Sequence, residues 1–152
     1  MHIVLFQPEI PGNTGTIGRS CFLTGATLHL IRPLGFDIDD KTAKRAGLDY
    51  WSQLDLRVYD DFDDFLTQNN HPTIYMCETN TDNIYSDMTY SPDPYLMFGR
   101  ETTGIPDEIL APYKKTAIRI PMLPDSRSLN LSNTVSIVMY EVLRQQGFPG
   151  LV

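Results

Sequence analysis

The 152-residue sequence has few cysteines, few histidines and no long hydrophobic run. The two cysteines, Cys21 and Cys77, lie in apolar stretches and are too few for a disulfide framework. The three histidines lie far apart and have no metal-ligand spacing with the cysteines, so we predict no bound metal. No stretch approaches the roughly 18 apolar residues of a membrane span, and no basic leader marks a signal peptide. We therefore predict a cytoplasmic protein without a membrane partner.

The sequence also has fewer basic than acidic residues. There are 12 Lys and Arg against 19 Asp and Glu, which gives a formal net charge of −7. Proteins that bind nucleic acids generally carry a basic footprint, because phosphate contacts supply much of their affinity. The charge therefore argues against indiscriminate RNA binding. It leaves room for a small basic face, since Lys41, Lys44 and Arg45 cluster together, as do Lys114 and Lys115.

Repeats, low-complexity tracts and linkers are missing too, so we predict a single domain over residues 1–152. Short apolar runs at 2–6, 27–31, 56–59, 73–77, 95–98 and 117–120 are predicted strands. Predicted helices alternate with them: up to residue 24 with Asn13 or Thr14 as cap, 40–45, 61–68 capped by Asp60, 106–111, and a C-terminal helix that Gly147 ends. This alternation predicts an α/β fold with a mostly parallel sheet and helices on both faces.

Glycine-rich nucleotide motifs are incomplete in this chain. Gly12, Gly15 and Gly18 follow a G-x-x-G-x-x-G pattern, which differs from the dinucleotide-binding G-x-G-x-x-G. Gly99 and Gly104 have the spacing of a Walker loop, but Ile-Pro follows where Lys-Ser/Thr must stand. No G-x-S-x-G elbow occurs either. These absences disfavour NAD-dependent, ATP-dependent and serine-hydrolase chemistry.

Three polar segments remain, Gln7–Arg19, Leu96–Pro106 and Pro121–Asn133, and each follows a predicted strand. In parallel α/β sheets, ligands bind at the loops beyond the carboxyl ends of the strands. The first segment places Asn13 at the start of a helix, and the second places Glu101 on a glycine-flanked loop. The three segments are therefore predicted to form one site.

In their order and spacing, these segments closely resemble the motifs of the SPOUT RNA methyltransferases. Pro-Glu-Ile-Pro at 8–11, Asp-Tyr at 49–50 and Pro-Asp-Ser-Arg-Ser at 124–128 are similar to the tRNA wobble-nucleotide 2′-O-methyltransferases, the TrmL or YibK-like family. The resemblance runs from residue 3 to about residue 150. It implies methyl transfer from S-adenosyl-L-methionine to the ribose 2′-hydroxyl of the wobble nucleotide, cytidine or modified uridine, with S-adenosyl-L-homocysteine as product.

The resemblance also implies a C-terminal deep trefoil knot, formed from about Ile74 onward with the helix 129–146 threaded through a loop. Implied partners are the tRNA anticodon stem-loop and a second copy of the chain in a homodimer. The implied cofactor-binding residues are Cys77, Glu78, Gly99, Arg100, Ile120, Met122, Ser128 and Leu129. The implied catalytic residues are Arg19, Asn13, Glu101, Asn130 and Tyr140.

Arg19 matches the catalytic arginine of this family. An arginine with a pKa above about 12 is a poor general base, so we expect Arg19 to grip a neighbouring phosphate and orient the ribose. Asn13 is expected to position Arg19 or its loop, and Glu101 to support the active-site loops. Tyr140 is expected to act on the partner subunit's substrate or at the dimer interface.

The sequence departs from the common family pattern in places. Arg100 stands where proline is frequent, Gly12 and Gly18 replace bulkier residues, and only Lys41, Lys44 and Arg45 remain of a basic helix. Two alternatives stay open: 2′-O-methylation of another RNA such as rRNA, and a non-catalytic RNA-binding or assembly protein of the same fold. The intact set of catalytic residues argues against the second.

Overall fold

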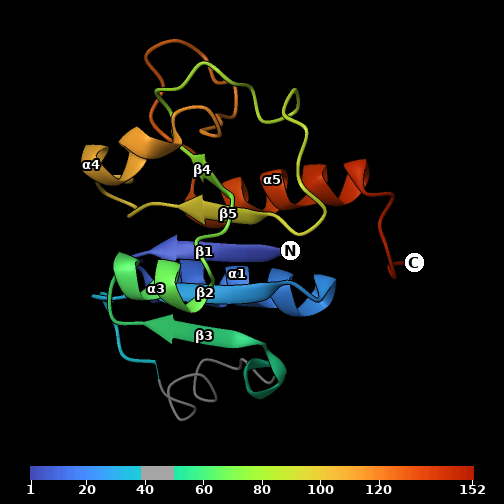
Figure 1. The fold of residues 1–152 in the computed structure, drawn as a ribbon. Helices are drawn as coiled ribbons and strands as arrows, with labels where there is room; N and C mark the ends of the chain where they lie inside the picture. The colour runs from blue at the N-terminus through green and yellow to red at the C-terminus, as the bar shows by residue number, and fades with distance from the viewer. Residues whose placement is uncertain (39–49) are drawn as a thin grey trace.

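A computed structural model describes residues 1–38 and 50–152 (Figure 1). Its five-stranded sheet has the order β3-β2-β1-β5-β4, and all four neighbouring pairs are parallel. The strands are β1 (His2–Phe6), β2 (Thr27–Ile31), β3 (Leu56–Tyr59), β4 (Ile74–Cys77) and β5 (Tyr95–Phe98). The predicted helix at 40–45, with its basic residues, lies outside the described residues. Among those described, no helix is long and apolar enough to span a membrane.

Alternate residues of the central strands point to two separate cores. Ile3 and Leu5 of β1 pack into one cluster, and Val4 and Phe6 pack into the other. Because both faces of the sheet are covered, the strands are nearly continuous apolar runs, as is usual for parallel sheets. This explains why the strand positions could be predicted closely from apolar runs alone.

Helices cover both faces of the sheet, as predicted. Helices α1 (Pro11–Thr24) and α5 (Leu131–Gln145) contact each other and cover the face of Ile3 and Leu5. On the opposite face, α3 (Phe62–Gln68) and α4 (Asp107–Leu110), with the short helix η2 (Ala111–Tyr113), pack over Val4 and Phe6. A further short helix, η1 (Trp51–Gln53), lies beside α1. In Figure 1, α3 lies in front of the sheet and α1 behind it. The α/β architecture is confirmed, and the knot stays a prediction.

The two predicted helix caps were wrong. Helix α1 begins at Pro11, so Asn13 and Thr14 lie within its first turn, and the N-cap residue Ile10 has no capping side chain. Proline suits this first position because its ring fixes a helical φ and its missing N–H would be unpaired there. Helix α3 is capped by Asp61, whose carboxylate accepts the N–H of Asp64 at 2.8 Å, whereas Asp60 precedes the cap.

The predicted strand at 117–120 was also wrong. Its residues form only two isolated bridges, Ile118 with Cys77 and Arg119 with Ile84. The segment pairs with β4 at one position and then changes partner: the N–H of Arg119 donates to the carbonyl of Asn83 at 2.9 Å. The segment therefore borders the sheet beside β4 without joining it as a strand.

The strand order creates a switch point beside β1. The chain passes from β1 to β2 and β3 on one side, then crosses to β4 and β5 on the other. The loops after β1 and β5 thus leave adjacent strands at the same edge of the sheet. A crevice at such a switch point is the usual ligand site of an open α/β sheet.

Candidate functional site

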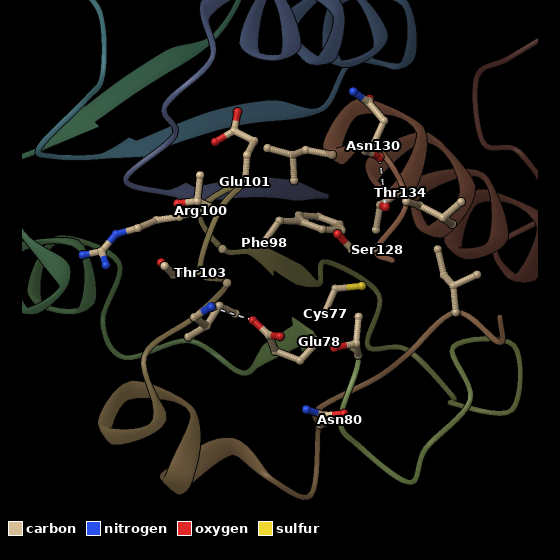
Figure 2. Close-up of a pocket in the computed structure, with 18 of the residues that line it drawn as sticks. Cys77, Glu78, Asn80, Phe98, Arg100, Glu101, Thr103, Ser128, Asn130 and Thr134 are labelled. Atoms are coloured by element: carbon tan, nitrogen blue, oxygen red, sulfur yellow. Dashed lines mark hydrogen bonds between the residues drawn. The ribbon is translucent and has the colours of Figure 1, made fainter. Parts of the chain in front are cut away.

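A cleft of about 780 Å³ lies at this edge of the sheet, which is within the usual volume range of small-molecule sites. Its walls come from the ends of β4 and β5, the loops that follow them, and the segment leading into α5. Figure 2 shows the Phe98 ring, the Cys77 side chain and Ser128 around one space. All of the predicted cofactor-binding residues line this cleft: Cys77, Glu78, Gly99, Arg100, Ile120, Met122, Ser128 and Leu129.

The loop after β5 is closed tightly on itself. Arg100 and Gly104 exchange backbone hydrogen bonds of 3.2 and 3.0 Å. A Cβ atom at Gly99 would lie only 2.2 Å from the carbonyl carbon of Gly104, so a larger residue at position 99 would force the loop open. Gly104 adopts a φ of +69°, which favours glycine. These two glycines therefore fix the direction in which Glu101 leaves the loop.

Glu101 caps helix α1 from this loop. Its carboxylate accepts the backbone N–H groups of Glu9 at 2.8 Å and Ile10 at 3.1 Å, and the side-chain amide of Asn13 at 3.1 Å. Glu9 and Ile10 directly precede the helix, so their N–H groups have no partner within it, and a negative charge beside a helix N-terminus is favourable. Glu101 thus supplies the cap that α1 lacks in its own sequence.

Glu9 completes a reciprocal connection between the two loops. Its carboxylate accepts the N–H of Thr102 at 3.0 Å and the hydroxyl of Thr102 at 2.8 Å. Sequence reasoning did not select Glu9. The available signal was a carboxylate in the loop after β1, two residues before Pro11 at the start of α1.

The network continues from Asn13 into helix α5. The side-chain N–H of Asn130 donates to Asn13 Oδ1 at 3.0 Å, and Asn130 Oδ1 accepts the N–H of Ser132 at 2.9 Å. Asn130 is therefore the N-cap of α5, which begins at Leu131 rather than at Leu129. Asn13, Glu101 and Asn130, predicted from three distant segments, form one hydrogen-bonded chain on the cleft wall.

Two ionisable groups at the end of β4 have pKa values shifted by burial. Burial raises the pKa of the Cys77 thiol to about 12, so this thiol is protonated and unreactive at neutral pH. Burial also raises the pKa of Glu78, whose carboxylate accepts the N–H of Ile105 at 2.5 Å. Glu78 thereby holds the far end of the Gly99–Gly104 loop as well as lining the cleft.

Arg19 and Tyr140 do not line the cleft. Arg19 is exposed on α1, and the Tyr140 side chain is 51% exposed on α5. Leu23 and Ile137, one helical turn from each of them, are 62% and 37% exposed. Helices α1 and α5 contact each other, and we refer to these exposed residues of the two helices together as the α1–α5 patch: Arg19, Leu23, Ile137 and Tyr140.

The chain is similar to known proteins in sequence and in fold. The model of the SpoU rRNA Methylase family matches residues 1–140. The Escherichia coli (strain K12) protein named tRNA (cytidine(34)-2′-O)-methyltransferase is 48% identical over 100% of this chain and 98% of its own length. A solved structure described as giving insights into the 2-OH methylation of C/U34 on tRNA has a TM-score of 0.88 and 40% identity, over 96% of this chain and 95% of its own.

A second solved structure, the AdoMet-bound rRNA methyltransferase from Sinorhizobium meliloti, has a TM-score of 0.80 and 26% identity, covering 94% of this chain and 55% of its own. The family match spans most of the chain, and the relatives agree with it in sequence and in fold. This chain belongs to the SpoU rRNA methylase family.

Proposed function

We propose that this protein transfers a methyl group from S-adenosyl-L-methionine to the ribose 2′-hydroxyl of nucleotide 34, the wobble nucleotide, of tRNA. The observation that carries the proposal is the full-length similarity to a relative named for this reaction on cytidine 34. The substrate nucleotide is cytidine or a modified uridine, in line with the C/U34 description of a structural relative. The cleft and its Asn13–Glu101–Asn130 network supply the site.

The cleft suits S-adenosyl-L-methionine in size and chemistry. Phe98, Ile120 and Leu129 give apolar walls that suit an adenine, and the backbone around Gly99 offers hydrogen-bond partners. Glu78 and Asp107 are carboxylates on the same wall, and negative charge favours a cationic ligand. When bound, the cofactor supplies a methyl group activated by a positively charged sulfur, and S-adenosyl-L-homocysteine remains after transfer. Cys77, Met122, Ser128 and the backbone of Arg100 complete the proposed cofactor site.

Arg19 orients the RNA in this proposal. A ribose 2′-hydroxyl is a weak nucleophile, and holding it in line for attack supplies much of the rate of such a reaction. The guanidinium of Arg19 stays charged and binds a phosphate next to the target ribose through its planar fork. In this proposal, that phosphate accepts the proton that the hydroxyl loses as its oxygen attacks the methyl group. Glu101 and Asn13 hold the start of α1, and through it the position of Arg19.

The protein acts as a homodimer in this proposal, with the α1–α5 patch as the contact. Leu23 and Ile137 are large apolar side chains exposed on one helical layer, and covering them is favourable. Arg19 lies on the patch and outside the lining of the cleft of its own chain. A dimer through this patch brings Arg19 and Tyr140 of one protomer to the RNA held at the cleft of its partner.

The RNA partner is the anticodon stem-loop of tRNA, and the protein works in the cytoplasm, where tRNA is modified in bacteria. The net charge of −7 limits non-specific phosphate contacts, so recognition depends on a few well-placed cations. A weak dependence of tRNA binding on salt is expected for the same reason.

The proposal is tested by mass spectrometry of tRNA from a strain that lacks the gene. Loss of the 2′-O-methyl group at the wobble ribose, restored by the wild-type gene, is the expected result. Loss of a methyl group from rRNA, with tRNA methylation unchanged, would show that rRNA is the substrate, as the name of the family allows. No lost methylation, together with no binding of S-adenosyl-L-methionine in isothermal titration, would indicate a non-catalytic RNA-binding or assembly protein.

A further inference from the structure

The side chain of Arg100 leaves the cleft that its backbone lines. Figure 2 shows the Arg100 guanidinium extending away from Phe98 and Ser128, beyond the edge of the sheet. A contact with a cofactor inside the cleft would therefore come from the backbone of this residue. The guanidinium takes no part in the Asn13–Glu101–Asn130 network.

Gln7 and Phe6 hold this guanidinium in place. Arg100 Nε donates to Gln7 Oε1 at 2.8 Å, and Nη2 donates to the same oxygen. The amide of Gln7 is fixed in turn, because its Nε2 donates to the carbonyl of Arg32 at 3.2 Å. The guanidinium carbon lies 5.4 Å from the centre of the Phe6 ring. Within the described residues, Nη1 has no hydrogen-bond partner, so one side of the fork is left for a ligand.

The support for Arg100 includes a strained backbone. Gln7 has a φ of +50°, in the left-handed region that costs a non-glycine residue on the order of 1 kcal/mol. Such strain persists only where the surroundings enforce it, and here it places the Gln7 amide between Arg32 and Arg100. Strained backbone of this kind is concentrated at functional sites.

Arg100 has no carboxylate partner among the described residues, unlike three of the other arginines. Arg32, Arg57 and Arg144 each form an ion pair with a carboxylate. Gln7 gives Arg100 a neutral partner instead, and no carboxylate oxygen of the described residues lies within 4 Å of it. In a chain of net charge −7, a fixed arginine without an acidic partner beside the cleft is a site for an anion. The exposed Lys114 adds a second cation to the cleft wall.

We propose that Arg100, held by Gln7, binds a backbone phosphate of the RNA strand that enters the cleft. The planar fork of a pre-positioned arginine fits a phosphate oxygen pair, and Gln7 removes the entropy cost of ordering the side chain. This inference rests on the proposed function, because it takes tRNA as the ligand. It assigns the RNA strand a path over the carboxyl ends of β1 and β5, next to the target ribose.

The test compares two charge-removing variants in tRNA binding measured by fluorescence anisotropy. Arg100→Met keeps the side-chain length over Phe6 and removes the fork. Arg57→Met removes the same charge from an exposed, ion-paired position on β3, the outermost strand on the side of the sheet away from β4 and β5. Arg100→Met is expected to weaken tRNA binding about tenfold and to reduce the salt slope by about 0.7. Arg57→Met is expected to leave both unchanged.

A third variant tests the role of Gln7. Gln7→Glu places a carboxylate against Arg100, which neutralises the guanidinium while leaving it in position. Its tRNA binding is expected to weaken as much as that of Arg100→Met, with unchanged binding of S-adenosyl-L-methionine in isothermal titration. Thermal unfolding of each variant shows whether the fold is intact.

Each outcome bears on the inference. Equal tRNA binding of Arg100→Met and Arg57→Met, in a protein whose wild type binds and methylates tRNA, overturns the inference and leaves the proposed function standing. Weaker cofactor binding with normal tRNA affinity assigns Arg100 to the cofactor and also overturns it. If the wild-type protein neither binds nor methylates tRNA, the proposed function and this inference are both overturned.

Discussion

The backbone N–H of Glu9 donates to the carboxylate of Glu101 at 2.8 Å, across 92 residues of sequence. This bond joins the loop after β1 to the loop after β5 at the switch point of the sheet. The first loop leads into α1, which carries Arg19, and the second lines the cleft. In the proposed enzyme, the Glu101 carboxylate, together with the reciprocal contact of Glu9 to Thr102, therefore holds the RNA-facing helix against the cofactor site.

Removing that carboxylate should both destabilise the protein and slow methylation. Glu101→Ala takes the acceptor from Glu9, Ile10 and Asn13, so we expect a loss of about 2 kcal/mol in the free energy of unfolding. Urea unfolding measures it. Glu108→Ala on α4, an exposed carboxylate, is the matched control and should change stability by less than about 0.5 kcal/mol. Equal stability of the two variants would show that Glu101 does not cap α1.

Arg19→Lys separates geometry from charge at the proposed catalytic arginine. Lysine keeps the positive charge and loses the planar fork that binds two phosphate oxygens. Because alignment of the ribose depends on that fork, the single-turnover methylation rate should fall roughly 100-fold. Arg57→Lys, at an ion-paired position on β3, should methylate at the wild-type rate. Near-normal turnover by Arg19→Lys would exclude a role that needs the fork.

The dimer proposal predicts that a charge on the α1–α5 patch separates the protomers. Leu23→Asp places a carboxylate where the proposed interface buries a side chain that is 62% exposed in the single chain. Sedimentation equilibrium should show a dimer for the wild type and a monomer for this variant. Leu123→Asp, at an 80% exposed leucine in the 121–130 segment, should remain dimeric. A monomeric wild type, or a dimeric Leu23→Asp, would contradict this interface.

A buried histidine should make the fold sensitive to acid. His29 Nε2 lies 2.8 Å from His2 Nδ1, and its Nδ1 lies 2.8 Å from the Tyr59 hydroxyl. Burial lowers the pKa of His29 to about 3. In the unfolded chain the His29 imidazole binds a proton below about pH 6.5, whereas in the folded chain it stays neutral down to about pH 3. The stability contributed by neutral His29 is therefore complete above pH 6.5 and is lost as the pH falls toward 3.

From pH 7.5 to 5.5, this one site should lower the free energy of unfolding by about 1.4 kcal/mol. The measurement is urea unfolding at the two pH values. The decrease should be smaller in His29→Gln and unchanged in His71→Gln, since His71 is exposed. The same decrease in His29→Gln and the wild type would rule out His29 as its source.

The strands and the positions of the site loops could be predicted because burial on both faces of a parallel sheet leaves an unambiguous apolar pattern. The segment 117–120 has the same apolar pattern, but it changes its pairing partner after one residue pair. The hydrophobic pattern of a segment does not determine which neighbour it pairs with. The cap of α1 was missed for a similar reason. Its partner, Glu101, is distant in sequence, whereas capping rules look only at neighbouring residues.

The lining of the cleft was predicted from the family resemblance, and the contacts within it were not. Nothing local in the sequence indicates that Asn13 bonds to Asn130, or that Glu9 and Thr102 close the link between the two loops. The direction of the Arg100 side chain was likewise unpredictable, because it depends on the left-handed backbone of Gln7. These features follow from the meeting of loops at the switch point.

The most direct test is methylation of two anticodon stem-loops that differ by a single oxygen atom. One carries ribose at nucleotide 34 and the other carries 2′-deoxyribose there, and both are incubated with the protein and radiolabelled S-adenosyl-L-methionine. The account predicts label on nucleotide 34 of the first RNA, as a 2′-O-methyl group, and none on the second. Equal labelling of both RNAs, or labelling of rRNA with neither stem-loop modified, would contradict it.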